Sequence, residues 1–166
     1  MGIVLGVDPG LATTGWGVVG VDGKRFQYLE SGKITSTPKQ PMGRRLERIF
    51  AGLQQVIETF GVTGCAVESG YVGVSAMSAL LLGQARAAAI LAAETKGIPV
   101  ETVAPREIKM AITGRGAATK AQVGYMTGKL LGLEFDEGEE DISDALAAAL
   151  WLVMRSQHPL TMRPAR

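Results

Sequence analysis

Two acidic residues in this 166-residue chain stand where a buried strand is expected to end. Asp8 follows an apolar run at residues 3–7 and precedes Pro-Gly, and Glu68 closes the apolar sequence "CAVE". Open α/β sheets gather their functional groups at the carboxyl ends of their strands. If these two strands are parallel neighbours, the carboxylates project from one edge and repel each other unless a cation lies between them.

Two further acids, Asp141 and Asp144, lie three residues apart at the start of the expected final helix, so they share one of its faces. Structural roles remain open for each candidate. Asp8 before Pro-Gly could simply begin a turn, and Asp141 with Asp144 resembles a helix-capping pair. A cap explains one of these two acids better than both, because the following "ALAAAL" face should be buried.

The four acids together, with no His or Cys beside them, predict a site for hard divalent cations, Mg²⁺ above all. Two such ions about 4 Å apart can hold the attacking and leaving oxygens of an in-line phosphoryl displacement. The set therefore indicates phosphodiester hydrolysis. The single cysteine, Cys65, excludes an intrachain disulfide and a Cys-based zinc site, and it is compatible with a reducing cytoplasm.

Length and composition point to one soluble domain. The hydrophobic fraction of 46% and the charged fraction of 20% are typical of globular proteins. The start of the chain lacks a signal-peptide pattern, and the apolar segment 76–93 is interrupted by Gln84 and Arg86, which makes it a poor membrane span. We expect a cytoplasmic protein without a membrane partner, a single domain over residues 1–166, and a flexible tail at 157–166.

Charge is unevenly distributed although the net charge is only +1. Residues 24–48 hold seven Lys or Arg against two acids, and residues 134–144 hold seven acids and no base. Such asymmetry can mark an interaction surface, although a solvated face is the commoner reason for a run of charge.

Local patterns predict the elements that must position the acids. Three strands at 3–7, 14–23 and 25–34 form an antiparallel meander, with a one-residue slip in the alternation at Val18–Val19 and an Asp-Gly turn at 22–23. Spacings of three and four predict an amphipathic helix at 42–60, and the Ala/Leu-rich segment 76–96, which Gly97 stops, should be a mostly buried helix. Pro105 should open a helical turn, and Thr119 should cap a helix that ends at Leu131. The expected order is β-β-β-α-β-α-β-α-α, one mixed sheet with helices packed on it in a single α/β domain.

Nearly end to end, the chain resembles the RuvC family of Holliday-junction resolvases. The resemblance is carried by "LGVDPGLATTGWGVV", "RRLERIFAGLQQVI", "AVESGY", "SALLLGQARAAAI", "PREIKMAITGRGAATKAQV" and "DISDALAAAL", whose joint order and spacing are highly specific. It implies an RNase H-like (retroviral-integrase superfamily) fold, a mixed five-stranded sheet flanked by helices. It also implies that the catalytic metal ligands are Asp8, Glu68, Asp141 and Asp144.

The resemblance further implies a homodimer that nicks two opposed strands of a four-way DNA junction. The reaction would use Mg²⁺, two ions per active site with Mn²⁺ as a substitute, in homologous recombination and DNA repair. The family works with the RuvA and RuvB branch-migration proteins. The apolar helix at 76–94 is a candidate dimer face as well as a candidate core helix, and the sequence does not separate the two.

Candidate DNA contacts follow from the same resemblance. Tyr71 matches an aromatic residue that stacks on a base at the junction centre, although a lid packed on the core would use the same residue type. Lys109 and Lys120 match lysines near the scissile phosphate, and Lys120 is counted with the catalytic residues. Arg115, in the loop before Lys120, is a further candidate contact.

Three other functions share parts of this pattern. A related RNase H-like enzyme could act on RNA or on an RNA–DNA hybrid, and a non-catalytic module could bind junctions without cutting them. An actin-like nucleotide-binding protein also places an Asp-x-Gly strand end before a hairpin, but that fold needs two such domains and this chain has room for one.

Overall fold

The first three strands form the antiparallel half of a sheet. In a computed structural model that describes residues 2–23, 25–70 and 75–156, β1 (Gly2–Asp8), β2 (Thr13–Asp22) and β3 (Arg25–Thr35) pair in chain order. The register between β2 and β3 shifts between Val18 and Val19, and both valines are buried, in separate core clusters. The predicted meander and the slip within it are confirmed.

Two strands add a parallel half on the other side of β1. β4 (Gly64–Glu68) pairs in parallel with β1, and β5 (Val100–Val103) pairs in parallel with β4. The strand order is β3-β2-β1-β4-β5. This confirms the predicted mixed five-stranded sheet, in which β1 is central and therefore has a strand partner on each side.

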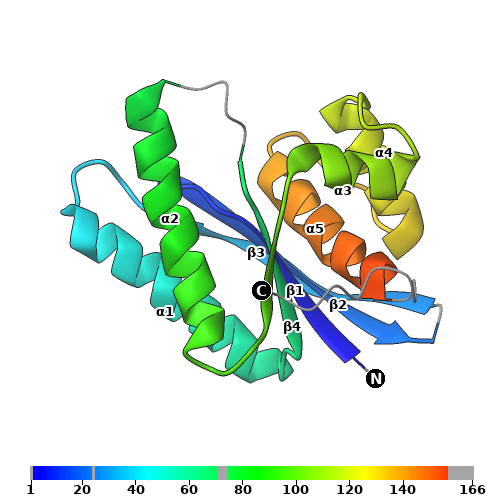
Figure 1. Cartoon of the computed structure of the whole chain (residues 1–166), viewed down its shortest axis with the longest axis horizontal. Helices are drawn as coiled ribbons and strands as arrows, with labels where there is room; N and C mark the ends of the chain where they lie inside the picture. The colour runs from blue at the N-terminus through cyan, green and yellow to red at the C-terminus, as the bar shows by residue number, and fades with distance from the viewer. Residues whose placement is uncertain (1, 24, 71–74, 157–166) are drawn as a thin grey trace, which may run out of the picture.

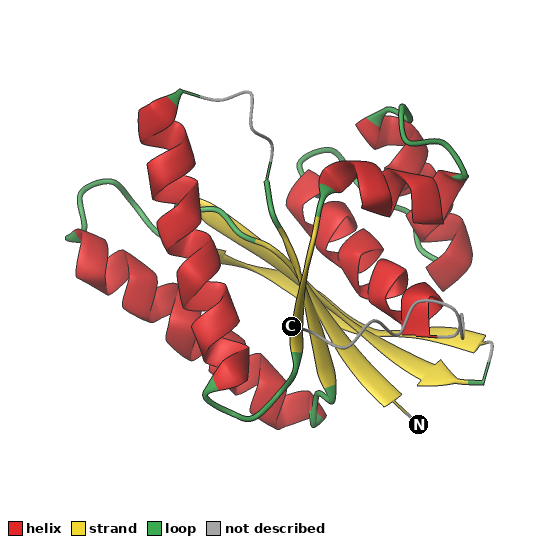
Figure 2. Cartoon of the chain, viewed as in Figure 1, coloured by secondary structure: helices red, strands yellow, loops and turns green. Residues whose placement is uncertain are grey.

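Helices cover both faces of the sheet (Figures 1 and 2). One face carries α1 (Met42–Phe60) and α2 (Ala76–Glu94), and the other carries α3 (Pro105–Thr113), α4 (Lys120–Leu131) and α5 (Glu140–Ser156). Three helices follow β5 where the sequence order predicted two. Gly114 follows the last residue of α3, and Thr119 caps α4 as predicted, its hydroxyl accepting a hydrogen bond from the Gln122 amide.

Helix α2 is less buried than its apolar sequence predicts. Its second half buries alanines from Ala85 to Ala93, whereas Met77 and Leu80 in its first half are 64% and 61% exposed. The prediction of a mostly buried helix was therefore wrong for the first half. By length and composition alone α2 could span a membrane, which is weak support for a span because core helices of soluble proteins meet the same criteria.

Helix α5 lies directly on the sheet because glycines line its path. Gly6 of β1 pairs with Gly17 of β2, and Gly15 of β2 pairs with Asp8. A Cβ atom added to Gly6 would overlap the carbonyl oxygen of Ala145 and lie 2.6 Å from the amide nitrogen of Ala149. Helix backbone thus touches strand backbone, and α5 residues 145–150 are almost completely buried.

This close approach predicts a large penalty for one added methyl group. Gly6→Ala should lower the free energy of unfolding by about 1–3 kcal/mol or more, because α5 would have to move away from β1. Urea denaturation monitored by circular dichroism measures the change.

The matched control is Gly43→Ala in α1, where an added Cβ meets nothing within 4 Å. Alanine is about 1 kcal/mol more favourable than glycine inside a helix, so this variant should be at least as stable as the parent. Equal stability of Gly6→Ala and the parent would contradict the close packing of α5 against β1.

Candidate active site

The edge at which β1 and β4 end brings two of the predicted acids together. The strands run in parallel with Val7 opposite Val67, so the next residues, Asp8 and Glu68, leave neighbouring strand ends in step. Alternation along β1 turns Asp8 to the same face as Gly6, the face that α5 covers. Both acids are partly buried there.

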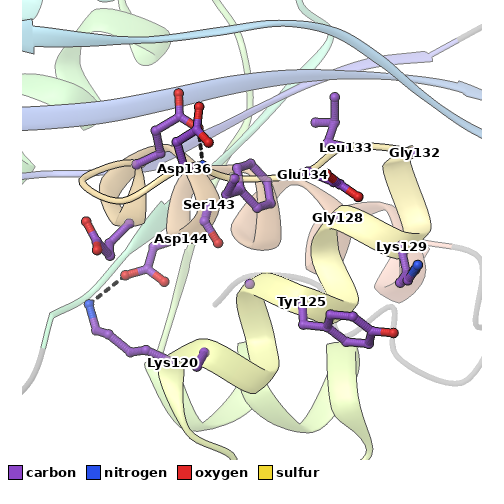
Figure 3. A pocket seen from close by; sticks show the side chains of 15 residues that line it. Lys120, Tyr125, Gly128, Lys129, Gly132, Leu133, Glu134, Asp136, Ser143 and Asp144 are labelled. Carbon is purple, nitrogen blue, oxygen red and sulfur yellow. Dashed lines mark hydrogen bonds and ion pairs between the residues drawn. The ribbon is translucent and has the colours of Figure 1, made fainter.

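The first two turns of α5 supply the other two acids. The backbone and Cβ atom of Asp141 pack against Gly15, which is the strand partner of Asp8. The Asp144 carboxylate accepts a hydrogen bond from the Lys120 ammonium at 2.7 Å, and its side chain is only 14% exposed (Figure 3). Among the described residues, neither aspartate accepts a hydrogen bond from the helix's own amides, so helix capping does not account for the pair.

The four acids influence one another electrostatically. The pKa of Asp8 is raised from 3.8 to about 8, mainly by burial and in addition by the negative charges of Glu68, Asp144 and Asp141, while the charge of Lys120 lowers it. Burial likewise raises the pKa of Glu68 to about 7, with Asp144 adding to the effect. The structure therefore gathers the predicted acids into one cluster with more negative charge than its neighbours neutralise.

The donor chemistry of this cluster fits a hard divalent cation. All the candidate donors are carboxylate oxygens, and a divalent charge would offset the repulsion among them, which adds to the effect of burial on the pKa of Asp8. Within the described residues, no three or more Asp, Glu, His or Cys side chains are arranged so that they could hold a metal ion as they stand. Asp144 instead pairs with Lys120, and Asp141 pairs with Lys33 at 3.5 Å.

The predicted basic residues divide into two groups. Lys120 at the start of α4 and Lys109 on α3 both lower the pKa of Glu68 by their charge, so the structure places both near the acids. Arg115 is exposed in the loop that joins these helices.

Tyr71 and the predicted tail at 157–166 lie outside the described residues.

Two residues that hold the site are not evident from the sequence. The Arg86 guanidinium of α2 donates to the backbone carbonyl of Ser69 at 2.8 Å, which ties down the residue that follows Glu68. Lys33 of β3 contacts Asp141 and donates to the carbonyl of Gly138. In the sequence, these two residues look like any other Arg or Lys. The position of Lys33 beside Asp141 follows only from the register of β3 with β2.

A cleft of about 900 Å³ runs from Asp144 along α4 (Figure 3). Lys120 and Asp144 line one end of it, and the segment 132–136 faces α4 further along. The ring of Tyr125 lines this cleft, is 65% exposed and lies 5.4 Å from the Lys129 ammonium. The sequence does not single out Tyr125, because one aromatic residue in a mixed helix carries no distinctive signal.

The chain is similar to known proteins of one family over nearly its whole length. The family model described as "Crossover junction endodeoxyribonuclease RuvC" matches residues 4–151. Two proteins of that same description are similar to the chain. The one from Saccharophagus degradans is 45% identical over 150 residues, covering 90% of this chain and 86% of that protein. The one from Rubrobacter xylanophilus is 41% identical over 148 residues, covering 89% and 83%.

The fold agrees as well. The structure of Thermus thermophilus RuvC in complex with Holliday junction substrate superposes with a TM-score of 0.88 at 32% identity, covering 94% of this chain and 95% of that one. The predicted RNase H-like fold is confirmed by this likeness together with the mixed sheet.

The raised pKa values predict how stability depends on pH without metal. An acid whose pKa is higher in the folded protein binds more protons there, so the free energy of unfolding should fall as pH rises from about 4 to 8. Asp8→Asn removes one charge, and should raise the melting temperature at pH 8 by about 2–4 °C per kcal/mol of repulsion relieved. Thermal melts in chelator at both pH values test this.

Asp22→Asn, an identical change at an exposed hairpin acid, should leave the pH profile as it is in the parent. Added Mg²⁺ should stabilise the parent at pH 8 and stabilise Asp8→Asn less. If the stability of the parent rises between pH 4 and 8, the inference that the acid cluster carries excess negative charge is wrong.

Proposed function

The chain belongs to the RuvC family of crossover junction endodeoxyribonucleases, and from that premise we propose that it resolves Holliday junctions by metal-dependent hydrolysis of two opposed DNA strands. One observation carries the proposal: two strand ends and the first two turns of α5 bring Asp8, Glu68, Asp141 and Asp144 into one cluster beside Lys120.

We propose that these four acids hold two Mg²⁺ ions and that Mn²⁺ can replace them. Such ions would supply an activated water and stabilise the leaving oxygen. Asp8 and Glu68 stand on buried strands, which limits their movement. The Lys120 side chain is 73% exposed, so its ammonium could turn from Asp144 to a phosphate oxygen and stabilise charge that develops there.

The DNA is expected to run over the edge at which these residues gather. Lys109, Arg115 and Lys120 follow one another around α3, its loop and α4, where cations can hold phosphates. Tyr71 remains the candidate for stacking on an unpaired base. We propose that the protein acts in the cytoplasm, in homologous recombination and DNA repair, with RuvA and RuvB as partners.

A four-way junction offers two equivalent strands, which favours a dimer with two equivalent sites. The exposed apolar side chains of α2 suggest where the two copies meet. Met77, Leu80 and Leu91 are 64%, 61% and 54% exposed. At 100° per residue they lie within about 60° of one another around the helix. We propose that this stripe, continuous with the α1–α2 side of the domain, is the homodimer interface.

The central experiment compares the parent with Asp8→Asn on a branch-migratable four-way junction in Mg²⁺. We expect paired, symmetric nicks from the parent. The variant should bind the junction and cut at least about 1,000-fold more slowly, because a lost metal ligand removes several kcal/mol of transition-state stabilisation. Asp22→Asn is the matched control and should cut like the parent.

Substrate and metal series separate the alternatives. Preferential cutting of an RNA–DNA hybrid would favour the related nuclease. Junction binding without cleavage at any Mg²⁺ concentration would favour a non-catalytic module. If Asp8→Asn cuts as fast as the parent, the proposed metal site is wrong.

The proposed interface makes a separate prediction. Leu80→Glu should convert the parent dimer to a monomer in light scattering after gel filtration, because it buries a charge in an apolar contact. Met110→Glu introduces the same charge at a residue of α3 that is 50% exposed, and should remain dimeric. A monomeric parent at micromolar concentration would contradict the dimer itself.

A further inference from the structure

Lys33 reaches the acid cluster from the edge strand, and none of the chemistry proposed above uses it. It stands opposite Gly15 of β2, and Gly15 stands opposite Asp8 of β1. The parallel register of β1 and β4 places Glu68 next. These four residues therefore form one row across four strands. Alternation along the strands turns Lys33 to the same face as Asp8, the face that α5 covers.

The start of α5 lies on this row. A Cβ added to Gly15 would overlap the backbone carbonyl of Asp141 and lie 2.9 Å from its Cβ. The Asp141 side chain therefore begins above the glycine, with Lys33 on one side of it in the row and Asp8 on the other. The empty position at Gly15 lets the lysine of the edge strand reach an acid of the cluster.

One ammonium group makes two contacts at this point. The Nζ atom of Lys33 lies 3.5 Å from Oδ2 of Asp141 and donates a hydrogen bond to the backbone carbonyl of Gly138. The Gly138 contact holds the loop that precedes α5, and the Asp141 contact holds the first acid of the helix. The Lys33 side chain is only 28% exposed, so solvent screens its charge less than at an open surface.

The loop that Lys33 contacts and the sheet edge beside it carry negative charge, so they repel each other. Residues 134–144 carry seven acids, and the edge of the sheet already carries Asp8 and Glu68. Lys120 neutralises Asp144 from the other side of the cluster. Lys33 does the same for Asp141 through the Oδ2 atom, and a metal ion could bind the Oδ1 atom.

We propose that Lys33 is a positioning residue for the metal site: by tying Gly138 and Asp141 to the edge strand, it holds Asp141 in place for a divalent cation and so sets the affinity for that cation. This inference rests on the metal-dependent function proposed above. Lys33 contacts no reacting atom in this arrangement and acts only through Asp141 and the loop.

The test measures metal binding directly. We measure the affinity of the parent and of Lys33→Met for Mn²⁺, and separately for Mg²⁺, by isothermal titration calorimetry. The affinity of the variant should be at least about tenfold lower, which is the usual effect of removing a group that orients a metal ligand. Lys33→Arg keeps the charge and the donors and should recover most of the affinity. Lys39→Met removes the same charge from an exposed loop and should bind like the parent.

Junction nicking gives the second readout. The Mg²⁺ concentration for half-maximal nicking by Lys33→Met should rise by the same factor as the dissociation constant. The rate at saturating Mg²⁺ should stay within about twofold, because the reacting groups are unchanged. Unchanged metal affinity in Lys33→Met would overturn the proposal. Tighter binding would also overturn it, since Lys33 would then merely compete with the ion.

Two further results keep the inference separate from its premise. If the parent neither binds metal nor nicks junctions, the proposed function fails first. If the parent does both and Lys33→Arg binds metal as weakly as Lys33→Met, the positioning role of the charge is wrong. Melting curves of the variants in chelator show whether each is folded before metal is added.

Discussion

Direct contact between the backbone of α5 and the glycines of β1 and β2 is the constraint on which the acid cluster depends. A helix that covers a sheet is normally separated from it by a layer of side chains. Here Gly6 and Gly15 remove that layer, and α5 meets the sheet at Ala145 and Asp141. Acids from two strand ends and one helix can meet only because this gap is closed.

The same packing explains how the molecule tolerates buried negative charge. The raised pKa values of Asp8 and Glu68 show that ionising these acids opposes folding. Residues 145–150 of α5 bury apolar surface just behind the acids, and this favourable burial holds the helix in place. Lys120 and Lys33 partly offset the charge from opposite sides. If the site binds cations as proposed, the charge repulsion that lowers the stability of the metal-free protein also favours cation binding.

Much of the fold could be predicted because its signals are local. Asp8 at the end of an apolar run, the Asp-Gly turn at 22–23 and the periodic helix at 42–60 each depend on a few neighbouring residues, and each is found in the structure. The four acids were identified from their positions at element ends. Proximity of Asp8 and Glu68 required one further assumption, that β1 and β4 are parallel neighbours, which the register bears out.

The sequence by itself determined which elements form and which acids stand at their ends, because period, turn residues and caps act within a few positions. Only the tertiary structure decided that half of α2 stays exposed, that Tyr125 lines a cleft and that Lys33 meets Asp141. These features depend on strand register and on which helix covers which face. The basic segment 24–48 and the acidic segment 134–144 are far apart in the chain, and pairing of β3 with β2 is what lets them touch.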